Sequence, residues 1–492
     1  IKCMNSEKNH IYKQIIKYIG IFSSIQGLSV LTGVIRNKIT ALLLGTEGMG
    51  MMSLLNTTVI FMSQATGMGL SFSGVREIAA CKERGDQEGI QRCAAVIRAW
   101  TILTAIIGVA VCILSFKWID KLTFTWGDHS LHYLLLSPAL ALMAITAGET
   151  AILKGLHRMK ALAVIQMVAA VGALAITAPL LYFFDQAAIV PIIVLIALVT
   201  MLATIFYSFA TVRPRLGDWR RVYGRWKKLI GEGRPMVKVG LAFVTAAAMG
   251  SASELIIRAY LNVEGDLDTV GLYNAGYLLA ITYAGLIFSS LESDYYPRLS
   301  AVSNDITKIN EQMNYQTEVT LTLLSPLMCA FILLIPVIVP LLFSQKFNDA
   351  IPMAQATALT MMCKAACLPV SYVMLAKGDS KIYIRLEGLS YIMTIAGVIV
   401  GYKYGGLTGT GIGLTAAYAM ELTVNSICLR IRYGLKQKAK LITYFAIQMG
   451  MVVAVYASTY IHHDITRWCV GIGITVICTV YSVKYLKFSL RH

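Results

Sequence analysis

Several charged side chains lie inside long apolar stretches of the chain. Arg36 and Lys38 fall in the first stretch, Arg258 in a later one, and Lys364 near the middle of another. An ionisable residue at the centre of a membrane-spanning helix costs about 2.5–3.5 kcal/mol on insertion scales, and it usually faces a cavity or a partner. In such surroundings cations attract a diphosphate, which arginine can bind through two parallel hydrogen bonds. We therefore expect these four bases to bind an anionic ligand.

Acidic residues occupy the same kind of position. Glu254 precedes Arg258 by one helical turn and could form an ion pair with it. Glu149, Glu387 and Glu421 also lie in apolar stretches. These four glutamates could neutralise the bases or carry a coupling ion, and the sequence does not separate the two roles. Lys364 differs from Arg258 because it has no acid within a turn.

Three arginines, Arg76, Arg98 and Arg298, lie close to the ends of apolar stretches that meet basic loops. Their long apolar stems can lie along the helix while the guanidinium groups reach water. This is the structural explanation of all three. The functional alternative is gating, for which Arg76 and Arg298 are the residues we single out.

Enzymatic signatures are missing from the sequence. There is no GxxxxGK[ST] phosphate-binding loop, and the serine and histidine residues have no triad context. His462, His463 and Asp464 are adjacent in a short loop, and Cys363 and Cys367 share a helical face without an accompanying histidine or carboxylate. We expect no catalytic residue, no metal and no cofactor, so the protein is not predicted to be an enzyme.

The composition identifies the elements that must position these charges. Of the 492 residues 57 % are hydrophobic and 14 % charged, with a mean hydropathy of +0.66, whereas soluble domains carry about 25 % charged residues. At about 20 residues a span, the chain is an all-α polytopic membrane protein with about 14 transmembrane helices. The predicted spans are 15–44, 48–78, 94–116, 131–153, 161–183, 189–211, 236–262, 269–296, 316–343, 351–376, 384–403, 407–429, 441–460 and 466–486.

The loops between spans differ in charge. Alternate loops are rich in Lys and Arg, above all 212–235, whereas the opposite set, such as 45–47 and 462–464, is poor in bases. The positive-inside rule makes the basic loops and both termini cytoplasmic in a bacterial inner membrane. The net charge of +17 then reflects topology and anionic lipids, and no nucleic-acid partner is expected. Trp219, Tyr223 and Trp226 alternate with bases, which is typical of an amphipathic helix at the membrane surface.

The chain repeats itself. Arg36 and Arg258 are 222 residues apart, as are Arg76 and Arg298, and the segment 151–155 resembles 374–378. Two six-helix bundles in the same orientation are therefore expected, related by a pseudo-two-fold axis along the membrane normal, with the substrate site at their interface. The predicted domains are an N-terminal lobe (1–211), a basic cytoplasmic linker (212–235), a C-terminal lobe (236–430), and two additional helices with a cytoplasmic tail (431–492).

Small and helix-bending residues are placed within the spans. Gly409, Gly411 and Gly413 predict a close approach between helices. Five prolines fall inside predicted spans, where they kink the helix and free backbone groups that neighbours must satisfy. They are Pro138, Pro179, Pro326, Pro336 and Pro369.

Several short segments of the chain are distinctive when taken together. They are Arg36-Asn37-Lys38, Leu43-Leu44-Gly45, Gly48-Met49-Gly50, the glycines Gly67, Gly69 and Gly74, Gly271-Leu272-Tyr273, and Tyr296-Pro297-Arg298-Leu299-Ser300. These segments resemble the oligosaccharide flippases, the polysaccharide-transporter branch of the multidrug/oligosaccharidyl-lipid/polysaccharide (MOP) superfamily. Lys364, Lys377 and Glu387 also resemble a pattern of basic and acidic positions in O-antigen and enterobacterial-common-antigen flippases.

The resemblance implies two six-helix bundles with alternating access and two extra C-terminal helices. Its cargo would be an undecaprenyl-diphosphate-linked oligosaccharide, with membrane lipids and glycan polymerase or assembly proteins as partners. Arg36, Lys38, Arg258 and Lys364 would then face the central cavity. Related drug exporters bind cations and favour acidic cavity groups, so the bases argue against that alternative. A lipid II flippase of the same superfamily and a scaffold for glycan-assembly enzymes remain alternatives.

Overall fold

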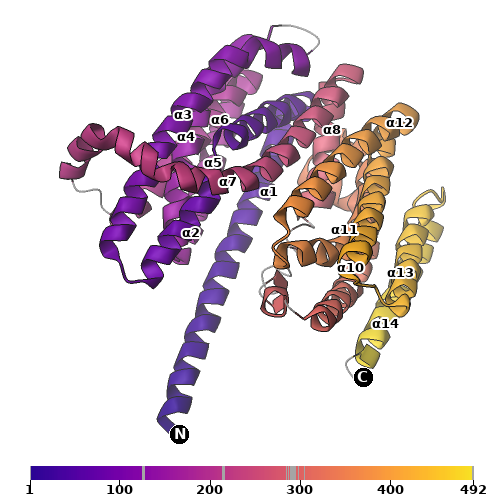
Figure 1. Ribbon diagram of the computed structural model, residues 1–492. Coiled ribbons are helices and arrows are strands. Elements are labelled where there is room, and N and C mark those ends of the chain that lie inside the picture. The colour runs from indigo at the N-terminus through magenta and orange to yellow at the C-terminus, as the bar shows by residue number, and fades with distance from the viewer. Residues whose placement is uncertain are drawn as a thin grey trace. The chain divides into compact units, whose positions relative to one another are not determined.

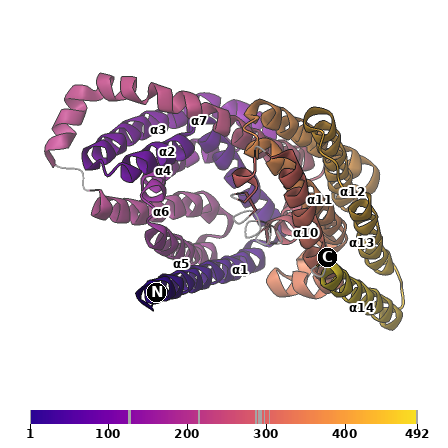
Figure 2. The ribbon, with the colours of Figure 1, turned by 60° about the horizontal axis from the view of Figure 1, so that its bottom comes forward.

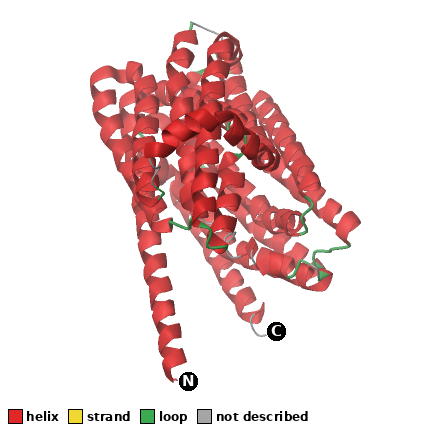
Figure 3. Ribbon diagram, turned by 60° about the vertical axis from the view of Figure 1, so that its left-hand side comes forward, coloured by secondary structure: helices red, strands yellow, loops and turns green. Residues whose placement is uncertain are grey.

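The computed structural model of the protein describes residues 2–124, 128–212, 216–283, 285, 288, 295–296, 298–303 and 305–489. These residues form helices joined by short turns, without a strand (Figure 3). Nine helical stretches among them are long and apolar enough to cross a membrane. The protein is thus an all-helical, multi-pass membrane protein, as the composition predicts. The chain divides into two compact units, unit 1 with residues 1–48 and 52–255, and unit 2 with residues 49–51 and 256–492.

Unit 1 contains the first helices of the chain (Figure 1). Its core joins Ile78 of α2, Ile97 and Trp100 of α3, Ile152 of α4 and Met236 of α7. The elements are α1 (Lys2–Thr66), α2 (Leu70–Glu83), α3 (Gln87–Thr123), α4 (Ser130–Gly155), α5 (Met159–Phe184), the 3-10 helix η1 (Asp185–Ala188), α6 (Ile189–Thr211) and the first part of α7 (Leu216–Glu264).

Unit 2 is built around α10 and α11, whose apolar faces meet α13 and α14. α13 and α14 lie side by side in both views (Figures 1 and 2). A buried polar network connects them, in which Gln448 of α13 donates to Ser482 of α14 over 2.8 Å. The elements after α7 are α8 (Leu267–Tyr277), the π-helix η2 (Leu278–Tyr283), α10 (Ile306–Leu342), the 3-10 helix η3 (Gln345–Ala350), α11 (Ile351–Ala376), α12 (Ser380–Tyr433), α13 (Ala439–Ser458) and α14 (Asp464–Ser489).

Glycine breaks decide where several predicted spans begin and end. α1 is interrupted at Gly45 (φ 67°) and α12 at Gly405 and Gly406 (φ 56° for the latter), which confirms the predicted turns there. Glycine adopts such positive φ angles without the steric penalty of a side chain. The unbroken span 48–78 is wrong, because the left-handed Gly69 (φ 68°) separates α1 from α2.

The predicted linker 212–235 and the following span form one continuous helix, α7, from Leu216 onward. Residues 213–215 and the side chains of Trp219, Tyr223 and Trp226 lie outside the described residues. Farther along α7, Glu232 forms an ion pair with Arg92 of α3 over 2.7 Å. This part of α7 is therefore attached to the core of unit 1.

The two halves of the chain repeat in their helix lengths. α3 and α10 each have 37 residues, and α4 and α11 each have 26. Both 37-residue helices start after an aspartate N-cap, Asp86 and Asp305, whose side chain accepts hydrogen bonds from backbone N–H groups of the first turn. The internal repeat seen in the sequence thus extends to the lengths of these two pairs of helices.

The five prolines predicted inside spans all lie within helices, in α4, α5, α10 and α11. Pro336 of α10 has no N–H to donate to the carbonyl of Ile332, four residues earlier. That carbonyl instead accepts a hydrogen bond of 3.0 Å from the side-chain amide of Gln355 in α11. α10 is therefore tied to α11 by the group that the proline leaves unsatisfied.

The two arms of α12, before and after Gly405, pack at backbone distance. A Cβ atom on Gly413 would overlap the carbonyl oxygen of Gly397, and one on Gly409 would overlap that of Gly401. Gly411 approaches the backbone of Met353 in α11. The close approach predicted for these three glycines is confirmed.

We expect Gly413→Val to destabilise the protein by about 1–3 kcal/mol, because the added side chain must push the arms of α12 apart. Thermal unfolding in detergent, followed by circular dichroism, measures the effect. The matched control is Gly473→Val in α14, where a Cβ meets nothing within 4 Å. Equal transition temperatures for the two variants would contradict the packing explanation.

Candidate functional site

A polar cavity of about 230 Å³ lies between α11 and α12 in unit 2. Its α11 wall consists of Lys364, Cys367, Leu368, Ser371, Tyr372 and Leu375. Steps of three and four residues place all six on one face of the helix. The other wall belongs to both arms of α12, which supply Tyr383, Glu387, Ser390 and Tyr391 before the break, and Tyr418 and Glu421 after it.

Glu421 is held in place by hydrogen bonds to both carboxylate oxygens. Ser390 donates to Oε2 over 2.7 Å, and the Cys367 thiol donates to Oε1 over 3.5 Å. Asn425, one turn farther along α12, donates to the Ser371 hydroxyl over 3.1 Å and to the Cys367 sulfur over 3.3 Å. The cavity therefore continues into an ordered polar network that joins α11 to the second arm of α12.

Lys364 is half-buried, and its Nζ lies 5.5 Å from the centre of the Phe288 ring. Lys364 lines the same cavity as Glu387 and Glu421. Glu387 interacts electrostatically with the positive charge of Lys364 and with the negative charge of Glu421. The sequence places no acid within a turn of Lys364, but the fold supplies two from another helix. One cation and two carboxylates therefore line the same cavity.

Sequence reasoning missed the tyrosines of this cavity. Tyr383 lies one turn before Glu387 and Tyr391 lies one turn after it. Both hydroxyl groups form hydrogen bonds with the Glu387 carboxylate. Tyr372 and Tyr418 complete the aromatic lining. The spacing of Tyr383, Glu387 and Tyr391 could have indicated a shared face. A cavity with such groups can bind an ion or a hydroxyl-bearing ligand.

The α11–α12 turn anchors the far end of α12. Asp379 accepts hydrogen bonds from Arg432 Nε over 2.7 Å and from the Tyr433 hydroxyl over 2.9 Å. The Arg432 guanidinium beside it holds the pKa of Asp379 below its ordinary value. This contact attaches the C-terminal end of α12 to the turn between α11 and α12.

Arg258 occupies a separate place in unit 2. Its side chain is buried, with 5 % exposed, and its Nη2 donates to Asn274 Oδ1 over 3.3 Å. The guanidinium carbon lies 6.0 Å from the Tyr273 ring centre and 5.6 Å from that of Tyr277. The residue is thus held between α7 and α8, where aromatic faces stabilise its charge.

The remaining predicted bases lie on other helices. Arg36 and Lys38 are half-buried in α1, and Arg76 is exposed on α2. Arg298 donates to Gln312 over 3.3 Å and to Gln316 over 3.1 Å. Glu254 is half-buried in α7. Convergence of Arg36, Lys38, Arg258 and Lys364 on one chamber stays a prediction.

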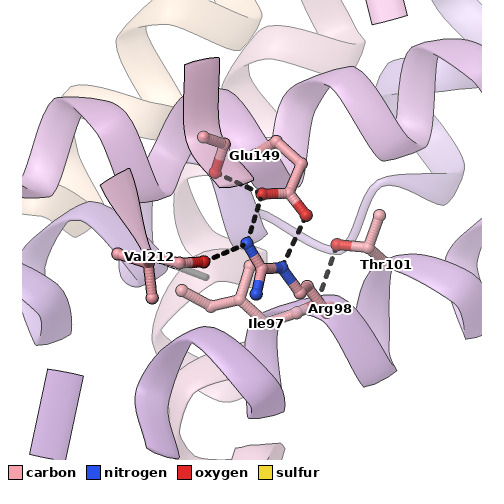
Figure 4. A network of polar contacts seen from close by, with 6 residues as sticks. Ile97, Arg98, Thr101, Glu149 and Val212 are labelled. Carbon is pink, nitrogen blue, oxygen red and sulfur yellow. Dashed lines mark hydrogen bonds and ion pairs between the residues drawn. The ribbon is translucent and has the colours of Figure 1, made fainter. Parts of the chain in front are cut away.

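Glu149 belongs to a buried ion pair in unit 1 (Figure 4). Arg98 Nε lies 2.7 Å from Glu149 Oε1, with side chains that are 13 % and 5 % exposed, and its Nη2 donates to Oε2 over 3.0 Å. Ser208 of α6 also donates to Glu149, and the Phe209 ring covers the guanidinium at 4.7 Å. Arg98 therefore does not extend to water as its position suggests, and the geometry supports pairing for Glu149.

Comparisons with solved structures place the fold. An inward-facing multidrug resistance MATE family transporter of the MOP superfamily superposes with a TM-score of 0.68 at 15 % identity, covering 82 % of this chain and 94 % of that one. The lipid II flippase MurJ in an inward closed conformation gives 0.67 at 14 % identity, covering 95 % and 99 %.

A third structure is described as a MOP superfamily transporter from Pyrococcus furiosus whose binding pocket has a reverse polarity that suggests a different function. It superposes with a TM-score of 0.54 at 15 % identity, covering 84 % of this chain and 93 % of that one. At this level of identity the three likenesses establish the fold. No curated protein matches the chain.

The sequence itself matches a family profile described as "Polysaccharide biosynthesis protein" over residues 15–303. The match covers more than half of the chain, including the helices that carry Arg258 and Tyr273. The protein is therefore a member of the polysaccharide biosynthesis protein family, with the fold of the MOP superfamily transporters.

Proposed function

We propose that the protein moves an undecaprenyl-diphosphate-linked oligosaccharide from the cytoplasmic to the periplasmic leaflet of a bacterial inner membrane. The observation that carries the proposal is Lys364, a cation placed in a polar cavity inside a membrane-spanning segment of a polysaccharide biosynthesis family member. Because an ionisable group there is expensive, it points to a functional role. Lys364 would contact a phosphate oxygen of the cargo, while the lipid tail stays in the bilayer.

The two carboxylates in the cavity must be neutralised before a diphosphate can bind there. With Glu387 and Glu421 both charged, the cavity carries more negative than positive groups and would repel a diphosphate. Uptake of a proton or another cation by the carboxylates would remove this repulsion and leave Lys364 as the dominant charge. We assign ion coupling to Glu387 and Glu421 on this ground.

The other predicted bases complete the proposal. Arg36 and Lys38 of α1 and Arg258 of α7 would bind the diphosphate or the glycan. The lobes of residues 1–211 and 236–430 would rock between two states during transport. Arg76 and Arg298 stay proposed gating residues, and Glu254 stays a proposed ion-coupling residue. Membrane lipids and a glycan polymerase are the expected partners.

A reconstituted assay tests this function. Proteoliposomes would contain a fluorescent undecaprenyl-diphosphate-linked sugar, and a membrane-impermeant reductant would report which leaflet holds the dye. We expect protein-dependent translocation of this lipid and none of a neutral polyprenyl glycoside that lacks the diphosphate. Movement of lipid II in place of the oligosaccharide lipid would instead favour the lipid II flippase. Movement of none of these lipids would contradict the proposal.

A drug exporter is the second candidate, favoured by the acidic pair Glu387 and Glu421 in the same cavity. Carboxylates inside a membrane cavity attract organic cations. Overexpression in cells would then raise resistance to ethidium, and Glu387→Gln would abolish that resistance. Unchanged sensitivity to ethidium and other cationic dyes would count against this candidate and leave the anionic cargo.

A further inference from the structure

A second cavity lies in unit 2 at the opposite end of the helices from the α11–α12 turn. It has a volume of about 300 Å³ and sits between the end of α10, the start of α11 and the turn between α13 and α14. Its apolar wall comprises Leu333, Pro336, Ile351 and Pro352, and its polar and aromatic groups are Asn348, Gln355, Thr459, Arg467 and Trp468. The bounds of the helices place it apart from Lys364.

Gln355 forms a fixed polar floor in this cavity. Its side chain is 5 % exposed, and its Nε2 donates over 3.0 Å to the Ile332 carbonyl that Pro336 leaves without a helical partner. This bond sets the orientation of the amide group. A buried amide held in this way offers a ligand a hydrogen-bonding group that does not have to be ordered on binding.

Arg467 and Trp468 form the opposite side. Arg467 Nη2 lies 2.9 Å from Asp464 Oδ1, but the two side chains are 30 % and 78 % exposed, and such exposed pairs contribute only about 0–1 kcal/mol. The guanidinium can therefore exchange this partner for a ligand. Trp468 is half-buried against the core that α10, α13 and α14 share, so its indole is a rigid wall.

From this arrangement we infer that the cavity binds one pyranose-sized sugar unit. Its volume lies at the lower end of the range of about 300–1,000 Å³ for small-molecule pockets, which suits one sugar ring. The indole can cover the apolar C–H face of the ring, while the amides of Gln355 and Asn348 and the Arg467 guanidinium bond to hydroxyl groups. The inference rests on the proposed function, in which the cavity takes a sugar of the exported glycan.

The predicted orientation of the protein in the membrane indicates at which stage of transport this cavity would bind a sugar. The start of α11 and the turn between α13 and α14 face outward if the basic loops are cytoplasmic. A sugar held there would belong to cargo that has already crossed. The site would then favour release to the outer side over return.

Tryptophan fluorescence of the full-length protein in detergent tests the site. The probes are methyl glucoside, N-acetylglucosamine, glucuronate and, as a lipid-headgroup analogue, glycerol 3-phosphate. We expect a saturable change with at least one sugar that is lost in Trp468→Phe and retained in Trp118→Phe, a matched change at an indole that is 77 % exposed on α3. Arg467→Gln, which keeps the reporter, should raise the midpoint about tenfold.

Two results would overturn the inference. One is the absence of a saturable change with all three sugars, whether or not glycerol 3-phosphate gives a response, and the other is the same change in Trp468→Phe. The failure of the inference and that of the proposed function can be told apart. Lys364→Gln should leave the sugar response intact while lipid translocation falls. A sugar response in a protein that moves no lipid would refute the proposed function only.

Discussion

Lys364→Gln is expected to lower the translocation of a diphosphate-linked lipid by about one to two orders of magnitude. A hydrogen bond to a charged group contributes about 1.5–3 kcal/mol, and the lost cation also leaves Glu387 and Glu421 facing the cargo without compensation. The proteoliposome assay measures the rate at lipid concentrations below saturation, where weaker binding of the cargo lowers the rate. Lys381→Gln, which removes an exposed lysine at the start of α12, is the matched control.

A double variant separates the transport role of Lys364 from its contribution to folding. Lys364→Gln combined with Glu387→Gln restores the balance of charge in the cavity and should recover the thermal stability that the single change removes. Transport should stay low, because the phosphate-binding cation is still missing. Rates close to wild type in both variants would refute a direct role for Lys364 in binding the cargo.

Arg98→Leu is expected to be the most destabilising single change in unit 1. Removal of one partner from a buried ion pair costs about 3–5 kcal/mol, because the remaining charge stays uncompensated. Glu149 is 5 % exposed and would keep only Ser208 as a donor among the contacts that hold it. Thermal unfolding in detergent would show a large fall in the transition temperature, accompanied by a poorer yield of monodisperse protein.

The Arg92–Glu232 pair supplies a matched control on the same helix. Its N–O distance is also 2.7 Å, but its side chains are 66 % and 24 % exposed. Exposed pairs contribute about 0–1 kcal/mol, so Arg92→Leu should change little. Arg98→Leu combined with Glu149→Leu should be more stable than Arg98→Leu alone, since a buried pair can often be replaced by apolar residues. A double variant that is less stable than the single one would contradict this account.

The outline of the fold follows from the sequence because lipid imposes a simple condition. Backbone groups in hydrocarbon must be satisfied within a helix, so apolar length alone predicts the spans. The breaks at Gly45 and Gly405 were predicted because their turns separate two apolar stretches. The break at Gly69 was not predicted, because it lies within an apolar stretch, although the pair Gly67 and Gly69 could have indicated it.

The charged partners were harder to predict, because sequence spacing identifies neighbours on one helix only. Glu254 could be named as a candidate partner for Arg258 from its spacing, whereas Glu387 and Glu421 share a cavity with Lys364 because both arms of another helix line that cavity. The Arg98–Glu149 pair could have been found by comparing how far each residue lies from the basic-loop end of its span. Both residues lie near the basic-loop ends of consecutive spans, which run in opposite directions.

The short helix breaks at Gly45 and at Gly405–Gly406 limit where a tag can be inserted into the chain. Each reversal uses one or two residues with special backbone angles, and the helices continue directly on either side. An epitope or fluorescent tag inserted there would unwind a helical turn on each flank. The segment between Ser458 and Asp464 is longer and mostly exposed, so it can accept such a label with far less disturbance.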